Sequence, residues 1–151
     1  MESDDSLKAL FESSSALAVI GIKDRENEDA FRVPAYMQKA GFKIIPVNPK
    51  LESVLGESCH DSLSGLSEAS PPIDIVNLFR ASEHVPNHVD EILALDPKPK
   101  AVWMQLGIHH GPSAQRLREA GIEVIQDRCI MVDHRRLLGT RANDARTKEE
   151  A

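Results

Sequence analysis

The chain lacks several features that define large classes of protein. It has only two cysteines, Cys59 and Cys129, in 151 residues, which is too sparse for a disulfide scaffold and gives no zinc-ligand spacing. Its longest apolar run, residues 16–22, is far too short to cross a bilayer. Lys and Arg number 18 against 24 Asp and Glu, so nucleic acid and anionic lipid are disfavoured as partners.

The N-terminal residues carry no basic segment followed by an apolar one, so no secretory signal is visible. With so few cysteines, this predicts a soluble protein of the cytoplasm with reduced thiols, an organelle matrix being the open alternative. His84 and His88 stand four residues apart, but no HExxH pattern surrounds them. We therefore expect no metal site, and no catalytic triad is identifiable.

Aromatic residues are also scarce, at 4%, whereas the hydrophobic fraction of 41% is ordinary for a single globular domain. Apolar runs typical of buried strands occupy residues 16–21, 42–47, 73–79, 101–104 and 122–125. Helical apolar periodicity occupies residues 6–13, 30–40, 83–95 and 112–120. A long connection with only short local structure separates the second strand from the third.

Strands that alternate with helices indicate a parallel sheet covered by helices. We therefore expect an α/β fold, a Rossmann-like doubly wound sheet of about five strands in the order 3-2-1-4-5, with helices on both faces. Residues 1–138 are predicted to form this domain. Residues 139–151 are charged and have no apolar period, so we expect a disordered tail.

Ligands of open parallel sheets bind beyond the carboxyl ends of the strands. The second strand ends in Val47, Asn48, Pro49 and Lys50, and an NAD-binding protein would carry a carboxylate in that region. A cation there suits a phosphorylated ribose instead. Coenzyme A and NADP both have such a ribose, and this residue alone does not decide between them.

Gly21 ends the first strand, where a missing Cβ lets the backbone approach a phosphate closely. The cations Lys23, Arg32 and Lys50 should converge at the same edge and could neutralise a pyrophosphate and a ribose phosphate. Each residue also has an ordinary explanation, as a strand terminator or a solvated surface cation. Their joint placement is what favours a ligand site. Pro49 stiffens its own turn and suits a fixed wall against an adenine ring.

Other candidates follow the later strands. Phe79 could cover an adenine or lie in the core, and Cys129 has Arg128 as its neighbour, which could lower the thiol pKa and raise its reactivity. The commoner explanation of Cys129 is a small buried side chain. A GxGxxG fingerprint is absent, and this argues against an ordinary dinucleotide site.

Six stretches together give the chain a family resemblance. They are AVIGI at 18–22, FRVPAYM at 31–37, GFKIIPVNPK at 41–50, DIVNLFR at 74–80, WMQLGI at 103–108 and DRC at 127–129. In this order they resemble the small single-domain CoA-binding proteins, which are Rossmann-like and similar to the CoA-binding domain of the succinyl-CoA synthetase α subunit. The resemblance runs from about residue 7 to residue 138.

The resemblance implies a five-stranded parallel sheet that binds CoA at its carboxyl edge. By position, the phosphates would be lined by Gly21, Ile22 and Lys23, with Arg32 nearby. The adenosine and its 3′-phosphate would be held by Val47, Asn48, Pro49 and Lys50. The rest of the ligand would be bordered by Phe79, Arg80, Gln105 and Gly107. The ligases of this superfamily work through a phosphohistidine on a further domain, for which these residues leave no room.

We therefore expect a binding or regulatory module for CoA or acyl-CoA, more readily than an enzyme, with no nucleic-acid or membrane partner. Two alternatives stay open. One is an NADP-dependent oxidoreductase, and the other is a CoA-linked thiol or acyl-transfer accessory protein in which Cys129 captures the CoA thiol.

Overall fold

A single parallel sheet organises the computed structural model, which describes residues 3–66 and 70–139. Its five strands are β1 (Ala16–Ile20), β2 (Lys43–Val47), β5 (Ile75–Leu78), β6 (Ala101–Met104) and β7 (Glu123–Ile125). A two-stranded antiparallel pair, β3 (Ser53–Val54) and β4 (Glu57–Ser58), lies in the long connection after β2. The predicted doubly wound α/β class is confirmed.

The predicted strand order is wrong. The sheet runs β2-β1-β5-β6-β7, which in chain order of the main strands is 2-1-3-4-5 and not 3-2-1-4-5. The third main strand crosses over and pairs with β1, as in the register of Leu17 with Ile75. The strand order therefore reverses between β1 and β5, and this switch point is where a ligand of such a sheet is expected.

Pro46 gives a physical reason for this order. The N–H of Lys43 donates to the Ser15 carbonyl toward β1 (2.8 Å), so the nitrogen of Pro46, three residues on, faces the opposite side. A strand added there would find no donor at Pro46, and proline is confined to edge strands for this reason. β5, in contrast, is buried along its whole length and suits the interior of the sheet.

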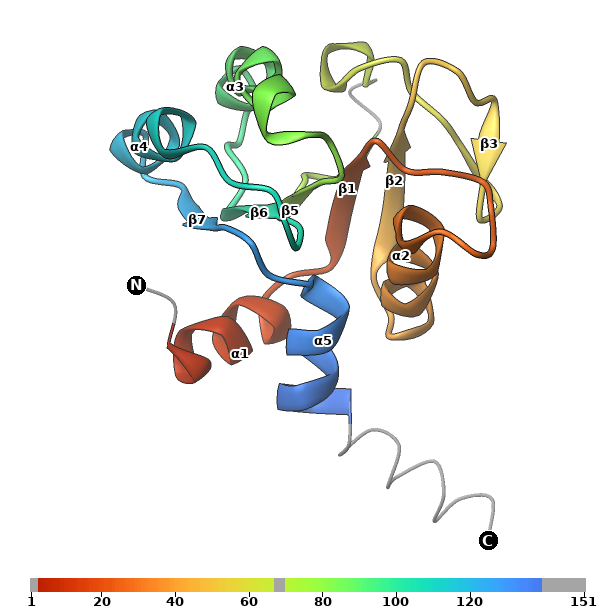
Figure 1. Cartoon of the computed structure of the whole chain (residues 1–151), viewed down its shortest axis with the longest axis horizontal. Coiled ribbons are helices and arrows are strands. Elements are labelled where there is room, and N and C mark those ends of the chain that lie inside the picture. The colour runs from red at the N-terminus through yellow and green to blue at the C-terminus, as the bar shows by residue number, and fades with distance from the viewer. Residues whose placement is uncertain (1–2, 67–69, 140–151) are drawn as a thin grey trace, which may run out of the picture.

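Helices cover both faces of the sheet (Figure 1). They are α1 (Asp4–Glu12), α2 (Asp29–Lys39), α3 (Pro86–Leu93), α4 (Gly111–Glu119) and α5 (Ile130–His134), with the short helical turns η1 (Leu63–Gly65), η2 (Ser82–His84) and η3 (Arg135–Gly139). The four helices predicted from periodicity are confirmed within a few residues. α5 and η3 were not predicted, because they are short and polar residues interrupt their apolar pattern.

The two faces of the sheet bury separate cores, and side chains of each strand alternate between them. Along β1, Ala18 and Ile20 join the core under α3 and α4, whereas Leu17 and Val19 join the core under α1, α2 and α5. Trp103 is fully buried in the second core and stacks on Phe11 with ring centroids 5.6 Å apart. Such double-sided burial explains why the strands are continuous apolar runs.

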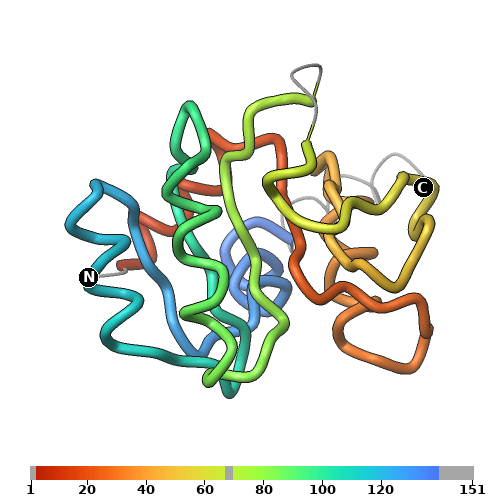
Figure 2. Tube along the Cα trace, turned by 90° about the horizontal axis from the view of Figure 1, so that it is seen from above, coloured from red at the N-terminus to blue at the C-terminus, as the bar shows by residue number. Residues whose placement is uncertain are grey.

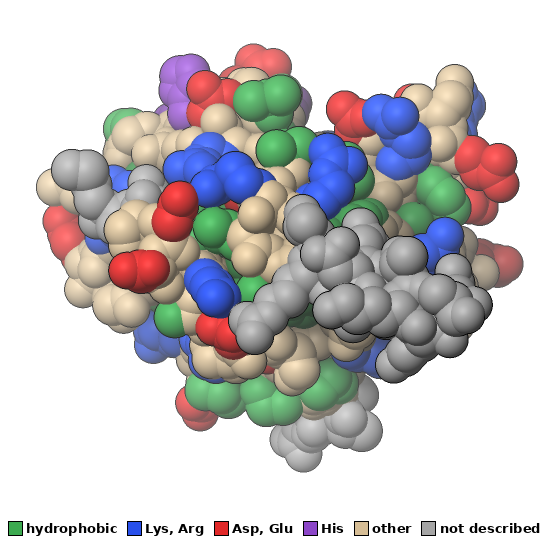
Figure 3. Space-filling model, turned by 90° about the horizontal axis from the view of Figure 1, so that it is seen from below, with side chains coloured by type: hydrophobic (Ala, Val, Ile, Leu, Met, Phe, Trp, Pro, Cys, Tyr) green, Lys and Arg blue, Asp and Glu red, His purple; other side chains and the backbone are tan. Residues whose placement is uncertain are grey.

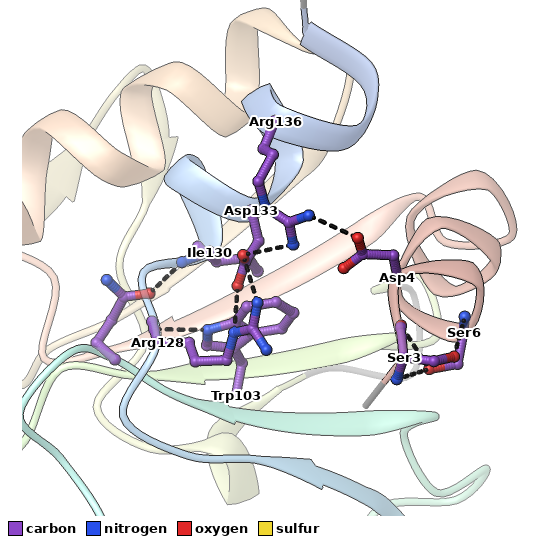
Figure 4. A network of polar contacts seen from close by, with 9 residues as sticks. Ser3, Asp4, Ser6, Trp103, Arg128, Ile130, Asp133 and Arg136 are labelled. Carbon is purple, nitrogen blue, oxygen red and sulfur yellow. Dashed lines mark hydrogen bonds and ion pairs between the residues drawn. The ribbon is translucent and has the colours of Figure 1, made fainter. Parts of the chain in front are cut away.

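Ion pairs hold α5 against its neighbours on the sheet face that α1 and α2 also cover (Figure 4). The buried carboxylate of Asp133 accepts two hydrogen bonds from Arg128, at 2.7 and 2.8 Å, and one from Arg136 at 3.1 Å. Arg136 also reaches Asp4 on α1, at 2.9 Å. The pKa of the Asp4 carboxyl is lowered by this hydrogen bond to Arg136. On the face viewed from below, acidic and basic side chains are interspersed (Figure 3).

The predicted tail lies outside the described residues, except for Gly139, which ends η3. Among the helices of the described ranges, none has the length and apolar character needed to span a membrane.

Candidate functional site

A cavity of about 400 Å³ opens at the carboxyl edge of the sheet, where β1, β2 and β5 end. Eight of the predicted site residues line it: Gly21, Lys23, Val47, Asn48, Pro49, Lys50, Phe79 and Arg80. Seen from above, the chain that follows β1 runs between the segments that follow β2 and β5 (Figure 2). The structure thus brings together residues from three distant parts of the sequence.

Gly21 is required here by the protein's own packing. Its φ is +88°, in the left-handed region, and a Cβ at this position would lie 2.5 Å from the carbonyl oxygen of Phe79. The Gly21 N–H donates to the Val47 carbonyl at 3.0 Å. A side chain would therefore push the β5 loop away from β1 and alter the floor of the cavity.

Pro34 shapes the loop between β1 and α2. Because proline has no N–H, the carbonyl of Ala30 lacks the donor that an α-helix would supply four residues on. The N–H of Lys23 donates to this carbonyl instead, at 3.1 Å. The loop is thereby tied to the first turn of α2, whose N-cap residue Glu28 makes no side-chain capping bond. The first N–H groups of the helix stay available for an anion.

Asn48 connects the two loops that flank the cavity. Its Nδ2 donates to the Ile22 carbonyl at 2.7 Å, and its Oδ1 accepts from the Lys50 N–H at 2.8 Å. This fixes the backbone of Lys50 and leaves its side chain exposed at the cavity wall. The rigid turn predicted at Asn48 and Pro49 therefore has a defined set of bonds.

Four predicted residues do not line this cavity, and three of them, Ile22, Arg32 and Gly107, have other places in the fold. Ile22 is fully buried in the core, and only its carbonyl contributes, as the acceptor for Asn48. Arg32 is exposed and its guanidinium pairs with Asp29. Gly107 forms a turn with φ +85°, and its N–H donates to Asp127 Oδ1 at 2.6 Å.

The remaining predicted residue, Gln105, lines a second, smaller cavity of about 210 Å³. This cavity shares Phe79, Arg80 and Ala81 with the larger one, so the two adjoin along the segment after β5. Cys129 also lines it, together with Ala30 from the first turn of α2.

Five further residues that line the larger cavity were not predicted from the sequence. They are Asp61, Ser62, His84, His88 and Glu91. Glu91 accepts the Leu63 N–H at 2.8 Å and lies 3.3 Å from His88 Nδ1. Asp61 and Ser62 follow the segment that pairs with the end of β2, and His84, His88 and Glu91 arrive with the crossover after β5. Local periodicity does not indicate either placement. In the described ranges, no group of three His, Cys, Asp or Glu residues could hold a metal.

The charges at the larger cavity are mixed. Lys23, Lys50 and Arg80 supply three cations, and Asp61 and Glu91 supply two carboxylates. Since the protein as a whole carries a net charge of −6, an anionic ligand depends on these local cations. Such an arrangement fits a molecule with a phosphorylated end and a neutral or hydrogen-bonding remainder.

Comparisons with known proteins identify a family and several relatives. Residues 15–135 match a protein-family model described as a CoA binding domain. An uncharacterized protein of Bacillus subtilis, YneT, is 40% identical over 128 residues, covering 85% of this chain and 91% of that protein. A Thermus thermophilus structure superposes with a TM-score of 0.84 at 37% identity, covering 91% of this chain and 100% of its own. A hypothetical protein from Pyrococcus horikoshii gives a TM-score of 0.82 at 28% identity, covering 91% of this chain and 93% of that one.

Proposed function

Because the chain belongs to the CoA binding domain family, we propose that its carboxyl-edge cavity binds coenzyme A or acyl-CoA. The observation that carries the proposal is the gathering of Lys23, Lys50 and Arg80 around the Gly21 turn in one cavity at the switch point of the sheet. Charge-assisted hydrogen bonds from such cations are the strong contacts available to phosphate groups.

Each part of the cavity suits a part of the ligand. Lys50, exposed beside the rigid Asn48–Pro49 turn, would contact the ribose 3′-phosphate. Lys23 would face the pyrophosphate. The first N–H groups of α2, which border the adjoining smaller cavity, would face it from the other side, since an N-terminal helix turn favours anions. The half-buried ring of Phe79 offers an apolar surface for the adenine or for the pantetheine arm.

We further infer that the chain acts as a binding or regulatory module. The cavity of about 400 Å³ is within the usual size range of small-molecule sites. Incubation with acetyl-CoA checks this inference: we expect the thioester to survive unchanged, and turnover of it would contradict a purely binding role.

Isothermal titration with CoA, dephospho-CoA and NADPH tests the ligand. Dephospho-CoA lacks the 3′-phosphate, so we expect it to bind more weakly by roughly 1.5–3 kcal/mol, the worth of a hydrogen bond to a charged group. Lys50→Ala should remove that difference. Lys98→Ala, at an exposed lysine outside both cavities, should preserve it.

The titration also separates the main alternative. The same lysine would suit the 2′-phosphate of NADP, so binding of NADPH without any heat from millimolar CoA would reject the proposal in favour of an NADP site. If CoA and dephospho-CoA bind equally well, Lys50 does not contact the 3′-phosphate.

A further inference from the structure

The two cavities adjoin along one segment of the chain. The segment Phe79, Arg80 and Ala81 lines both of them, and the Arg80 side chain lies directly against the Gly21 turn, with its Cδ 3.4 Å from where a Gly21 Cβ would be. A ligand whose nucleotide end occupies the larger cavity can therefore extend past Arg80 into the smaller one.

The smaller cavity contains a hydrogen-bond donor with no acceptor in the part of the chain that the structure describes. Gln105 is only 4% exposed. Its Oε1 accepts the Ile130 N–H at 2.9 Å and Asn77 Nδ2 at 3.2 Å, which fixes the orientation of the amide. Its Nε2 has no acceptor among the described residues, while Gln105 itself lines the cavity. This amide N–H is therefore free to donate to an acceptor in the cavity, such as an amide carbonyl of a ligand.

A thiol stands beside this donor. Cys129 is free, half-buried and part of the same cavity. Its neighbours on both sides are held in place: Arg128 is bound by the buried Asp133, and the Ile130 N–H donates to Gln105 (Figure 4). Arg128 is therefore engaged in a structural ion pair, and the thiol is presented to the cavity by a fixed backbone.

We propose that the smaller cavity takes the pantetheine end of the ligand and that Cys129 captures it as a mixed disulfide, an inference that rests on the proposed CoA-binding function. Gln105 Nε2 would donate to a pantetheine amide carbonyl, and Leu106, 70% exposed at the rim, would contact the aliphatic arm. The pantetheine arm carries both amides and a terminal sulfur, which is the combination that this cavity accommodates.

The reaction is a thiol–disulfide exchange and needs CoA disulfide as the co-reactant. The thiolate of Cys129 attacks one sulfur of CoA disulfide, and the sulfur–sulfur bond of that molecule breaks. A bond forms between Cys129 Sγ and one CoA sulfur, and the second CoA leaves as a thiolate that takes up the proton lost by Cys129. One disulfide is consumed and one is formed, so no further oxidant is involved.

Cys59 offers a matched control within the same chain. It is also free and half-buried, but it lines neither cavity. Burial and the negative charge of Asp24 raise the pKa of the Cys59 thiol. Near neutral pH a smaller fraction of Cys59 is therefore thiolate than for an ordinary exposed cysteine. Selective modification of Cys129 is therefore the signature to look for.

Intact-mass spectrometry of the full chain after incubation with CoA disulfide tests the proposal. We expect one CoA adduct on the native chain and on Cys59→Ser, and none on Cys129→Ser. Glutathione disulfide at the same concentration lacks the nucleotide, so it should label Cys129 at least 10-fold more slowly. Excess acetyl-CoA, which has no free thiol and cannot reverse the exchange, should slow the labelling by CoA disulfide.

The outcomes separate this inference from the function on which it rests. An adduct on Cys59, no adduct at all, or equal rates with glutathione disulfide would overturn the capture by Cys129 even if titration shows that reduced CoA binds. Absence of CoA binding in the titration would instead remove the proposed function itself.

Discussion

Gly21 illustrates how one residue can serve both packing and a ligand site. From sequence, it was assigned to a phosphate turn because a glycine allows close backbone approach. In the structure, the group that comes closest to Gly21 is the carbonyl oxygen of Phe79, which would lie 2.5 Å from a Cβ at position 21. The β1 turn and the β5 loop are thus held against each other at the switch point. Any phosphate contact depends on that arrangement.

Gly21→Ala should destabilise the fold by about 2–4 kcal/mol, because a left-handed φ costs an L-residue roughly 1–2 kcal/mol and the clash adds to it. Gly107→Ala is the matched control: φ is +85° instead of +88°, but nothing lies within 4 Å of the new Cβ. It should cost only about 1–2 kcal/mol. Urea unfolding of both variants measures the difference, and equal losses would refute a role for the Phe79 contact.

Among the elements, α2 is joined to the loop that follows β1 because one of its residues, Pro34, has no backbone N–H. Because of Pro34, the Ala30 carbonyl accepts no hydrogen bond within the helix, and it accepts the Lys23 N–H instead. A proline inside a helix would ordinarily be a defect. Here the freed acceptor anchors the loop that carries a cation into the cavity, so helix and loop form one unit.

Pro34→Ala tests this connection. The new N–H of residue 34 should compete for the Ala30 carbonyl and release the Lys23 N–H, whose hydrogen bond contributes about 1 kcal/mol. Amide hydrogen exchange at Lys23 should then be faster by roughly five- to tenfold. The Gly21 amide, bonded to the Val47 carbonyl, should be unaffected. Unchanged exchange at Lys23 would show that the loop is held by other contacts.

Another element, α5, depends on contacts distant in sequence. Asp133 joins Arg128 and Arg136, and Arg136 continues the network to Asp4 on α1. Surface ion pairs are individually weak, but the carboxylate of Asp133 is only 6% exposed and pairs with both arginines. The network holds α5 against the core that lies under α1, α2 and α5. It also fixes the segment that contains Cys129.

On the scale of the whole molecule, His134 lies where three parts of the chain meet. Its ring contacts Phe11, Tyr36 and Phe42 edge-on, with centroid distances of 5.1, 5.5 and 5.9 Å. Tyr36 OH lies 2.8 Å from His134 Nδ1. Burial in this aromatic surrounding lowers the pKa of His134 below 6.5, because it disfavours the imidazolium.

The stability of the fold should therefore fall in mild acid. Below pH 6.5 the unfolded chain binds a proton at His134 that the folded chain excludes until its own lower pKa is reached. Between these two pKa values stability decreases by at most about 1.4 kcal/mol per pH unit. Chemical denaturation of the native chain and His134→Gln at pH 8, 6 and 5 measures this. The variant should lose less stability on acidification, and parallel curves would contradict the prediction.

Much of the fold could be predicted from local pattern. Continuous apolar runs identified the five strands, because a strand covered on both faces has no polar side to show. Helical periodicity identified four helices for the related reason that each covers one face of the sheet. The residues at strand ends followed directly, since parallel strands bring their carboxyl ends to one edge. Eight of the predicted site residues accordingly line the cavity.

The pairing of distant strands could not be predicted from local pattern. It depends on which crossover buries more apolar surface and satisfies more backbone hydrogen-bonding groups. Nothing local states that β5 lies beside β1, and the absent N–H of Pro46 is informative only once its neighbours are known. That pairing brings His84, His88 and Glu91 to the cavity. The amino-acid sequence alone determined the elements and the edge at which a ligand would bind, through local burial and backbone chemistry. Tertiary structure decided the walls of the site, because these depend on contacts between residues far apart in the chain.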